Sequence, residues 1–273
     1  CVLSRSNQPG FETIVCDLQF NDIPANTLTD IDTVFHLAGI AHDSAKIENQ
    51  YQAVNVRATI QLAKLAVSSG VQKFVFLSSV KAGGNLSNNS SMDESSQGTP
   101  EGVYGRTKRE AEIKLLEIGR QSGMHVSIIR SSLVYGPLMK GNLKMMFLGV
   151  KKGWFPPLPE VHNRRSMIHV DDLVRAILLV SNDKRADGEI FIVTDGKQYS
   201  SRQIYSSMRK VIGKSEINWS MPSAIFKVIS LISPTTKCKI EKLFGNEYYS
   251  SKKIEKLGYK SRGTLKEMNK TLL

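Results

Sequence analysis

The sequence predicts an α/β fold: a doubly wound parallel sheet with a smaller, mixed C-terminal lobe. Short apolar segments rich in Val, Ile and Phe alternate with longer amphipathic segments along the first half of the chain. Apolar strands separated by such helices form parallel sheets that are covered on both faces. The 273 residues, with 41% hydrophobic and 23% charged content, are enough for one large core and a smaller lobe.

The first half of the chain supplies most of the predicted sheet. Val2 and Leu3 are typical of the end of a buried strand, and the helix at 103–119 has an apolar face. Strands are expected at 13–16, 33–37, 73–77 and 126–129, and helices at 48–69 and 103–119. The polar segment 83–94 is rich in Gly, Ser and Asn, and a long loop inside a compact domain is usually functional.

The second half predicts fewer sheet elements. Asp171 and Asp172 are placed to cap a helix at 173–181, a strand is expected at 190–193, and a further helix at 201–212. The apolar run 221–232 is broken by polar residues, which indicates a packed helix. We therefore expect residues 1–135 to form the main sheet domain and residues 136–273 to form mainly a lobe interleaved with that sheet.

Composition excludes several classes of protein. No apolar run reaches the roughly 18 residues of a membrane span. Cys1, Cys16 and Cys238 are odd in number and widely spaced, which indicates reduced thiols in a cytoplasmic protein and no metal site. The net charge of +12 permits nucleic-acid binding, but the basic residues are scattered. A basic surface that faces small phosphate-bearing ligands, and no nucleic acid, is the expectation.

Tyr104 and Lys108 are the residues whose spacing points to chemistry. Four residues apart, they project from the same side of the helix predicted at 103–119. A cation held near a phenol favours the phenolate, so we expect Lys108 to lower the pKa of Tyr104 toward the neutral range. Taken alone, the spacing also fits a solvated lysine beside a half-buried tyrosine, and the order of the surrounding motifs decides between the two.

Six motifs occur in the order and spacing of the extended short-chain dehydrogenases. They are Asp32-Thr33-Val34-Phe35-His36-Leu37-Ala38-Gly39, Asn55-Val56-Arg57-Ala58-Thr59, Phe76-Leu77-Ser78-Ser79, Tyr104 with Lys108, Val134-Tyr135-Gly136-Pro137, and Arg165-Ser166-Met167-Ile168-His169-Val170-Asp171-Asp172-Leu173. Nearly the whole chain resembles the NAD-dependent epimerase/dehydratase branch of that superfamily, which implies a Rossmann-like fold and an enzyme of nucleotide-sugar metabolism.

One motif of the family is not found in the sequence. Family members open with a strand and a G-x-x-G-x-x-G turn, which lets the pyrophosphate of the cofactor approach a helix N-terminus. No such turn precedes Ser4. We therefore expect the chain to lack the first strand, the glycine loop and the first helix, and to bind a dinucleotide incompletely.

The resemblance implies a set of cofactor-binding residues for NADP or NAD. Arg5 follows a strand at the place where NAD-preferring relatives carry an acid, so it favours NADP by pairing with a 2′-phosphate; a surface arginine is the alternative. Tyr104 and Lys108 are expected at the nicotinamide ribose, and Asn55 is expected to steady the site through backbone contacts. The remaining expected cofactor contacts are Asp17, near the adenine, and Leu37, Ala38 and Gly39, where Gly39 replaces a commoner alanine.

Catalysis is implied for Ser79, Tyr104 and Lys108. Ser79 would hydrogen-bond the sugar oxygen at the reacting carbon, Tyr104 would move the proton, and Lys108 would tune Tyr104 while hydride passes at C4 of the sugar. Ser79 as a simple cap at the end of a strand is the alternative. The expected substrate contacts are Ser79, Val80, Lys81, Asn142 and Arg165, with Arg165 clamping the diphosphate of a UDP-sugar.

The reaction subtype depends on Val80 and Lys81. Dehydratases of this branch carry an Asp-Glu pair there, and neither side chain can replace a carboxylic acid or a carboxylate, so dehydration is disfavoured. Arg5 favours a 4-keto reductase of a UDP-6-deoxy-amino sugar in surface-polysaccharide synthesis. The alternative is a 4-epimerase of UDP-glucose or UDP-N-acetylglucosamine. The resemblance also implies a possible homodimer, because the family often dimerises through two helices per subunit, one of which carries the tyrosine and lysine.

Two further classes remain open at the level of sequence. A non-catalytic dinucleotide-fold scaffold that binds RNA would fit the net charge, although it predicts loss of the Ser79, Tyr104 and Lys108 set, which is intact. An inactive fragment would follow from the missing glycine loop.

Overall fold

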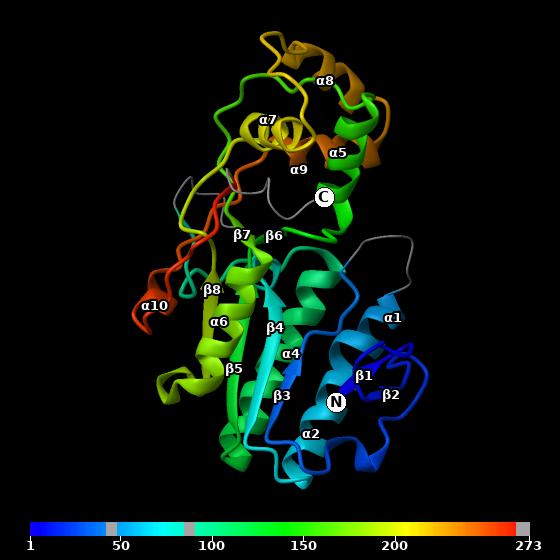
Figure 1. The fold of residues 1–273 in the computed structure, drawn as a ribbon, viewed down its shortest axis with the longest axis vertical. Coiled ribbons are helices and arrows are strands. Elements are labelled where there is room, and N and C mark those ends of the chain that lie inside the picture. Colours follow the sequence, from blue (N-terminus) through cyan, green and yellow to red (C-terminus); the bar gives the residue numbers. More distant parts are fainter. Residues whose placement is uncertain (42–47, 85–90, 266–273) are drawn as a thin grey trace.

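A four-stranded parallel sheet forms the centre of the protein in this computed structural model, which describes residues 1–41, 48–84 and 91–265. The strands are β3 (Thr33–His36), β4 (Lys73–Ser79), β5 (His125–Ser131) and β8 (Glu189–Val193), hydrogen-bonded in that order. Figure 1 shows helices on both faces of this sheet. The predicted doubly wound architecture is therefore confirmed.

Strand β4 shows why this sheet is covered twice. Phe74 and Phe76 pack on one face against α2 (Ala58–Ser68) and α4 (Gly102–Ser122). Val75, one residue out of phase, packs on the other face against α6 (Val170–Asn182). Because successive side chains of a strand point to opposite faces, a strand buried on both faces must be continuously apolar.

Two smaller parallel sheets lie beside the central one. Strands β1 (Val2–Ser4) and β2 (Thr13–Val15) pair with each other, and β6 (Leu133–Tyr135) pairs with β7 (Met167–His169). The short 3-10 helices are η1 (Ala25–Leu28) and η3 (Lys184–Ala186). Strand β8, from the second half of the chain, completes the central sheet, so the two halves are interleaved.

The C-terminal lobe is helical and has its own core. Its helices are α5 (Gly141–Lys152), α7 (Ser201–Val211), α8 (Ser223–Ser230) and α9 (Pro234–Phe244). Apolar side chains from all four meet in one cluster that includes Met146, Tyr205, Phe226 and Leu243. The short helix α10 (Lys252–Glu255) returns to the sheet and packs beside β8.

The helix expected at 48–69 is interrupted. It begins as α1 (Glu48–Tyr51), widens into a π-helical segment η2 (Gln52–Arg57), and continues as α2. A wider turn shifts the side chains that follow it around the axis, and such segments are frequent at functional sites. Asn55 lies in this segment and is fully buried.

The residue that caps α6 differs from the expectation. Helix α6 is capped by His169, whose Nδ1 accepts a hydrogen bond from the Asp171 N–H at 3.3 Å. The Asp172 carboxylate is buried and accepts hydrogen bonds from the Ser261 hydroxyl and from the N–H groups of Arg262 and Gly263. Asp172 therefore holds the C-terminal tail rather than capping the helix.

The packed helix expected at 221–232 is α8, and only one of its sides is packed. Phe226 enters the lobe core, while Val228 and Leu231 are exposed. Across the ranges given above, no helix is long and apolar enough to cross a membrane.

Candidate active site

Ser79, Tyr104 and Lys108 meet at the carboxyl end of β4. Ser79 is the last residue of that strand, while Tyr104 and Lys108 lie in the first two turns of α4. The Ser79 hydroxyl and the Tyr104 phenol form a hydrogen bond. Ser79 also caps α3 (Val80–Gly83), because its Oγ accepts the Lys81 N–H at 3.3 Å. A hydroxyl, a phenol and an amine thus come together from two elements far apart in the sequence.

Lys108 is buried behind this pair. Its Nζ donates to the Leu77 carbonyl at 2.9 Å and lies 4.4 Å from the centre of the Phe76 ring. Burial lowers the pKa of the Lys108 ammonium to about 8, although the nearby Glu112 carboxylate acts in the opposite direction. This amine can therefore change protonation state close to neutral pH.

The expected lowering of the Tyr104 pKa is not found. Burial raises the pKa of the phenol, the hydrogen bond from Ser79 partly offsets that effect, and Tyr51 and Glu112 raise it further. The reason is that desolvation of the phenolate outweighs the favourable contact. Tyr104 is therefore a protonated phenol at neutral pH in this structure.

Asn55 ties the loop after β3 to helix α4. Its amide oxygen accepts the Ile40 N–H at 2.8 Å, and its amide nitrogen donates to the Ile40 carbonyl and to the Thr107 hydroxyl, both at 3.1 Å. All three contacts are buried or partly buried, so the side chain fixes the distance between the loop and the residue that precedes Lys108.

Leu37, Ala38 and Gly39 form an exposed shelf at the end of β3. A Cβ atom on Gly39 would lie 3.1 Å from both the Asn55 Oδ1 and the Lys108 Nζ, which is tighter than ordinary contact. The absence of a side chain at Gly39 thus leaves space beside the Lys108 ammonium and the Asn55 amide.

Arg5 and Asp17 lie outside this cluster, after the two strands of the separate small sheet. Arg5 follows β1 and is exposed. Asp17 follows β2, where its carboxylate accepts the Gln19 N–H at 3.0 Å and its carbonyl accepts the Phe20 N–H at 3.0 Å. Asp17 therefore holds a turn, and both residues stand at carboxyl ends of strands, the edge at which parallel sheets bind ligands.

The expected substrate residues are dispersed. Val80 is buried, and the Lys81 ammonium lies 3.5 Å from the Glu101 carboxylate. Asn142 is exposed in the first turn of α5. Arg165 donates to the Glu247 carboxylate at 2.9 Å and to the Lys242 carbonyl. The arginine expected to clamp a diphosphate is thus already paired within the lobe.

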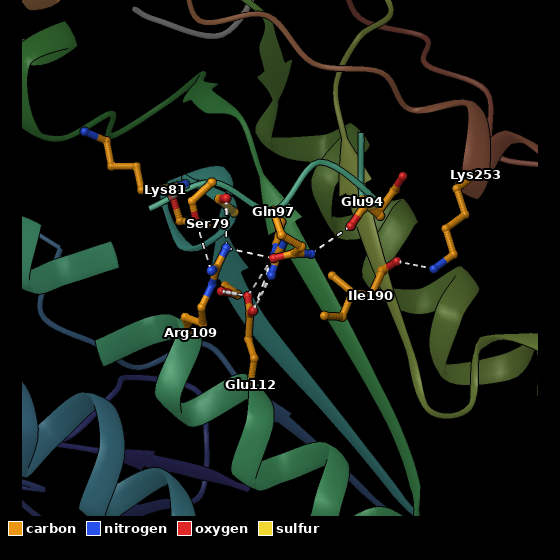
Figure 2. Close-up of polar contacts among 12 residues, drawn as sticks. Ser79, Lys81, Glu94, Gln97, Arg109, Glu112, Ile190 and Lys253 are labelled. Carbon is orange, nitrogen blue, oxygen red and sulfur yellow. Dashed lines mark hydrogen bonds and ion pairs between the residues drawn. The ribbon is translucent and has the colours of Figure 1, made fainter. Parts of the chain in front are cut away.

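A buried ionic cluster beneath Ser79 was not expected from the sequence. The Glu112 carboxylate accepts the Ser78 hydroxyl at 2.5 Å and the Arg130 guanidinium at 2.7 and 3.0 Å. Arg130 and Glu112 are almost inaccessible to solvent, and Figure 2 shows Glu112 rising from α4 toward the strand end that carries Ser79. Glu112 follows Lys108 by one helical turn, and Arg130 interrupts an apolar strand; both patterns were available in the sequence.

Arg109, one turn before this glutamate along α4, anchors the loop that enters the helix. Its guanidinium donates to the Gly83 carbonyl at 2.8 Å, to the Gly98 carbonyl at 3.0 Å and to the Gln97 side chain at 2.7 Å. Further along the same loop, the Glu94 carboxylate accepts the Ile192 N–H of β8 at 2.7 Å. These contacts hold Glu94, Gln97 and Gly98 in place. Residues 85–90 of the loop expected at 83–94 lie outside the described residues.

No group of three or more His, Cys, Asp or Glu side chains that could hold a metal ion occurs among the described residues.

Comparisons with known proteins identify the family. The profile described as "NAD dependent epimerase/dehydratase family" matches residues 3–194. A UDP-glucose 4-epimerase from Vibrio cholerae is 31% identical over 91% of this chain and 79% of its own length. An N-acetyl-alpha-D-glucosaminyl-diphospho-ditrans,octacis-undecaprenol 4-epimerase from Escherichia coli O157:H7 is 23% identical over 95% of this chain and 82% of its own length.

A solved structure supports the fold independently. The UDP-glucuronic acid 4-epimerase from Bacillus cereus, in complex with NAD, superimposes with a TM-score of 0.77 at 21% identity, and the match covers 97% of this chain and 80% of that one. With the profile covering more than half of the residues, this chain belongs to the NAD-dependent epimerase/dehydratase family of enzymes, whose Rossmann-like architecture it shares.

Proposed function

We propose that this chain is a UDP-sugar 4-epimerase that uses NAD. The observation that carries the proposal is the hydrogen bond between Ser79 and Tyr104 in front of the buried Lys108. The similarity to an epimerase of UDP-glucose over nine-tenths of the chain supports the same substrate class. The sequence favoured a 4-keto reductase because of Arg5; that activity is the second candidate here.

Each of the three residues has a role that its surroundings support. Ser79 donates a hydrogen bond to the C4 oxygen of the sugar. Tyr104 must be a phenolate to take the proton of that oxygen as hydride leaves C4, and it returns the proton when hydride comes back. Because burial raises the pKa of Tyr104 in the free protein, the positive charge of Lys108, fixed by the Leu77 carbonyl, would stabilise that phenolate when substrate is bound. When bound, NAD would accept hydride from C4 and return it.

The shelf and the π-helical asparagine support the cofactor assignment. Leu37, Ala38 and Gly39 would face the nicotinamide half, with Asn55 keeping the shelf in register with α4. Arg5 and Asp17, at the ends of β1 and β2, would take the adenosine half. Asn142 and Arg165 would bind the UDP moiety, the latter by exchanging its bond to Glu247 for one to a phosphate.

Dehydration remains disfavoured for a structural reason as well. Val80 is buried, and Lys81 pairs with Glu101, so neither places an acid or a base beside Ser79. The second candidate, 4-keto reduction with NADPH, is favoured by Arg5 alone, an exposed cation where a 2′-phosphate would be recognised.

Two further assignments complete the proposal. We propose a cytoplasmic enzyme, which the three free cysteines favour. We also propose a homodimer through α4, whose outward Ile113 is exposed.

The test is a pair of assays on the purified chain. With UDP-galactose and NAD, an epimerase produces UDP-glucose without net change in absorbance at the wavelength of the reduced dinucleotide. With a UDP-4-keto-6-deoxy sugar and NADPH, a reductase consumes the dinucleotide in proportion to product. Stoichiometric consumption, without interconversion of UDP-hexoses, would replace the first proposal by the second.

Tyr104→Phe tests the assigned role of the phenol. We expect kcat to fall by about 10³-fold or more while the melting temperature is retained, because only the hydroxyl is removed. Tyr205→Phe, which removes a buried phenol in the core of the lobe, is the matched control and should leave kcat unchanged. Retained turnover in Tyr104→Phe would show that another group moves the proton.

A further inference from the structure

The far end of the C-terminal lobe carries an apolar surface that nothing in the described chain covers. We call residues 217–240 the lobe tip; they include α8 and most of α9. Figure 1 shows α8 at the end of the molecule opposite the lower edge of the central sheet. The exposed fractions are 62% for Trp219, 64% for Val228, 83% for Leu231 and 75% for Ile232.

Helix α8 has a wide apolar face, of which only one edge is packed. At 100° per residue, its apolar side chains span a continuous arc from Phe226 through Ile229 and Ile225 to Val228, and Leu231 extends that arc past the end of the helix. Phe226 packs into the lobe, where its ring is 5.2 Å from the ring of Phe244, whereas Ile225, Val228 and Leu231 are exposed. An apolar helix face that is wider than its packed part is typical of a binding surface.

The charges of the lobe tip indicate which kind of partner covers its apolar surface. The lobe tip contains no Asp or Glu, and its three charged residues are Lys227, Lys237 and Lys239, all exposed. Glu241, the first acid after it, lies 4.0 Å from Lys237. A self-complementary contact between two copies would bring like charges together, which opposes association. An anionic surface would instead attract these lysines.

We propose that the lobe tip docks on a membrane surface rich in anionic lipid. Val228, Leu231 and Ile232 enter the boundary between headgroups and acyl chains, Trp219 lies at the headgroup level, and the lysines contact lipid phosphates. Aromatic rings with a polar edge favour that depth, and an apolar face flanked by lysines is the pattern of helices that lie in the interface. This proposal does not depend on the proposed reaction.

The test is cosedimentation of the full chain with vesicles. Vesicles of phosphatidylcholine that contain about one third phosphatidylglycerol should bind the protein, and vesicles of phosphatidylcholine alone should bind it much more weakly. V228S/L231S should weaken binding by about tenfold or more, because two exposed apolar groups are lost. K227Q/K237Q/K239Q should weaken it on the order of 100-fold.

Matched controls distinguish binding through the lobe tip from non-specific hydrophobic binding and from the effect of net charge. Phe20→Ser removes an exposed aromatic ring from the sheet half, and K64Q/K114Q/K184Q removes three exposed lysines elsewhere; both should bind like the unmodified protein. Trp219 provides a direct signal, since the chain has two tryptophans. In a Trp154→Phe background, its emission should shift to shorter wavelength when anionic vesicles are added.

Three results would overturn the proposal: no cosedimentation with the anionic vesicles, binding unaffected by V228S/L231S, or a dimer in lipid-free solution that V228S/L231S dissociates. The last would assign the surface to a second copy. Because the substituted residues lie outside the candidate active site, turnover of a UDP-sugar by V228S/L231S should equal that of the unmodified protein. Failure of the membrane proposal and failure of the epimerase proposal are therefore distinguishable.

Discussion

Two of the arginine–glutamate pairs among the described residues differ in how deeply they are buried. Arg130 and Glu112, beneath Ser79, have side chains that are 2% and 1% exposed. Arg165 and Glu247, in the lobe, are 13% and 22% exposed. The first pair also accepts the Ser78 hydroxyl, so it joins β4, β5 and α4.

The two pairs differ in whether the arginine can leave its glutamate and bind another anion. Neither charge of the buried pair has access to water, so removal of one leaves the other desolvated and without its nearest counter-charge. A pair with partial access to water can open at small cost and give its arginine to another anion. We therefore expect the buried pair to govern stability and the lobe pair to govern ligand affinity.

The largest effect should follow from breaking the buried pair. Arg130→Met should lower the free energy of unfolding by about 3–5 kcal/mol, because Glu112 would remain buried without its counter-ion. Urea denaturation measures this loss. Arg185→Met, which removes an exposed arginine paired with Asp183, should leave the same quantity almost unchanged, because solvent screens that pair.

A double variant sharpens that prediction. R130M/E112M should recover about half or more of the loss, because apolar groups of similar volume replace both charges. If R130M/E112M were less stable than Arg130→Met, the buried pair would stabilise the fold through its hydrogen bonds rather than through charge neutralisation.

Buried polar groups of the sheet half should also make its stability depend on pH. Burial and the nearby Lys108 lower the pKa of His36 to about 3, while its ring bonds the Thr59 hydroxyl at 2.8 Å. The unfolded chain therefore takes up the proton first, near pH 6.5. The stability from neutral His36 is complete above pH 6.5 and is lost as the pH falls toward 3, at up to about 1.4 kcal/mol per pH unit.

His36→Gln isolates this contribution. Urea denaturation at several pH values between about 4 and 7 should give a flatter dependence for His36→Gln, because glutamine does not titrate. His162→Gln, which changes a histidine of the lobe, is the control and should retain the slope of the unmodified protein. Equal slopes in all three proteins would mean that His36 is protonated in the folded state.

The Arg165–Glu247 pair should affect the affinity for the UDP-sugar. Arg165→Met should raise KM for the UDP-sugar by about tenfold, with about 1 kcal/mol or less lost from the free energy of unfolding. Steady-state kinetics and urea denaturation provide the two values. Arg164→Met, beside it and stacked 5.6 Å from the Tyr248 ring, should leave KM unchanged.

The smallest expected effect comes from the partner of that arginine. Glu247→Gln removes the carboxylate with which a phosphate would compete, so KM should fall by about two- to threefold. Glu160→Gln, which removes an exposed partner of Arg202, is the control. An unchanged KM in Glu247→Gln, together with an unchanged KM in Arg165→Met, would assign the lobe pair to structure alone.

Much of the sheet could be predicted from the sequence. The expected strands at 33–37 and 73–77 correspond to β3 and β4, and the helix at 103–119 corresponds to α4, each within three residues at either end. Continuous apolar strands leave a clear pattern because both faces are buried, and Tyr104 with Lys108 could be placed on one side of a helix by spacing alone.

The rest depended on contacts between distant segments. The pKa of Tyr104 is set by burial, which spacing along one helix does not reveal. The pairing of Arg165 with Glu247 joins residues 82 positions apart. Asp172 was interpreted as a helix cap because acids at a helix start usually are caps, whereas its carboxylate pairs with Arg175 and accepts backbone N–H groups from about 90 residues downstream.

The buried carboxylate of Asp172 determines how far the chain can be shortened. Asp172 holds the backbone of Arg262 and Gly263 against α6, so these residues function as part of the sheet half although they stand near the end of the chain. Truncation at residue 260 would remove the Ser261, Arg262 and Gly263 donors and leave the buried carboxylate with the guanidinium of Arg175. Deletion of residues 261–265 should therefore destabilise α6 and the sheet on which it packs.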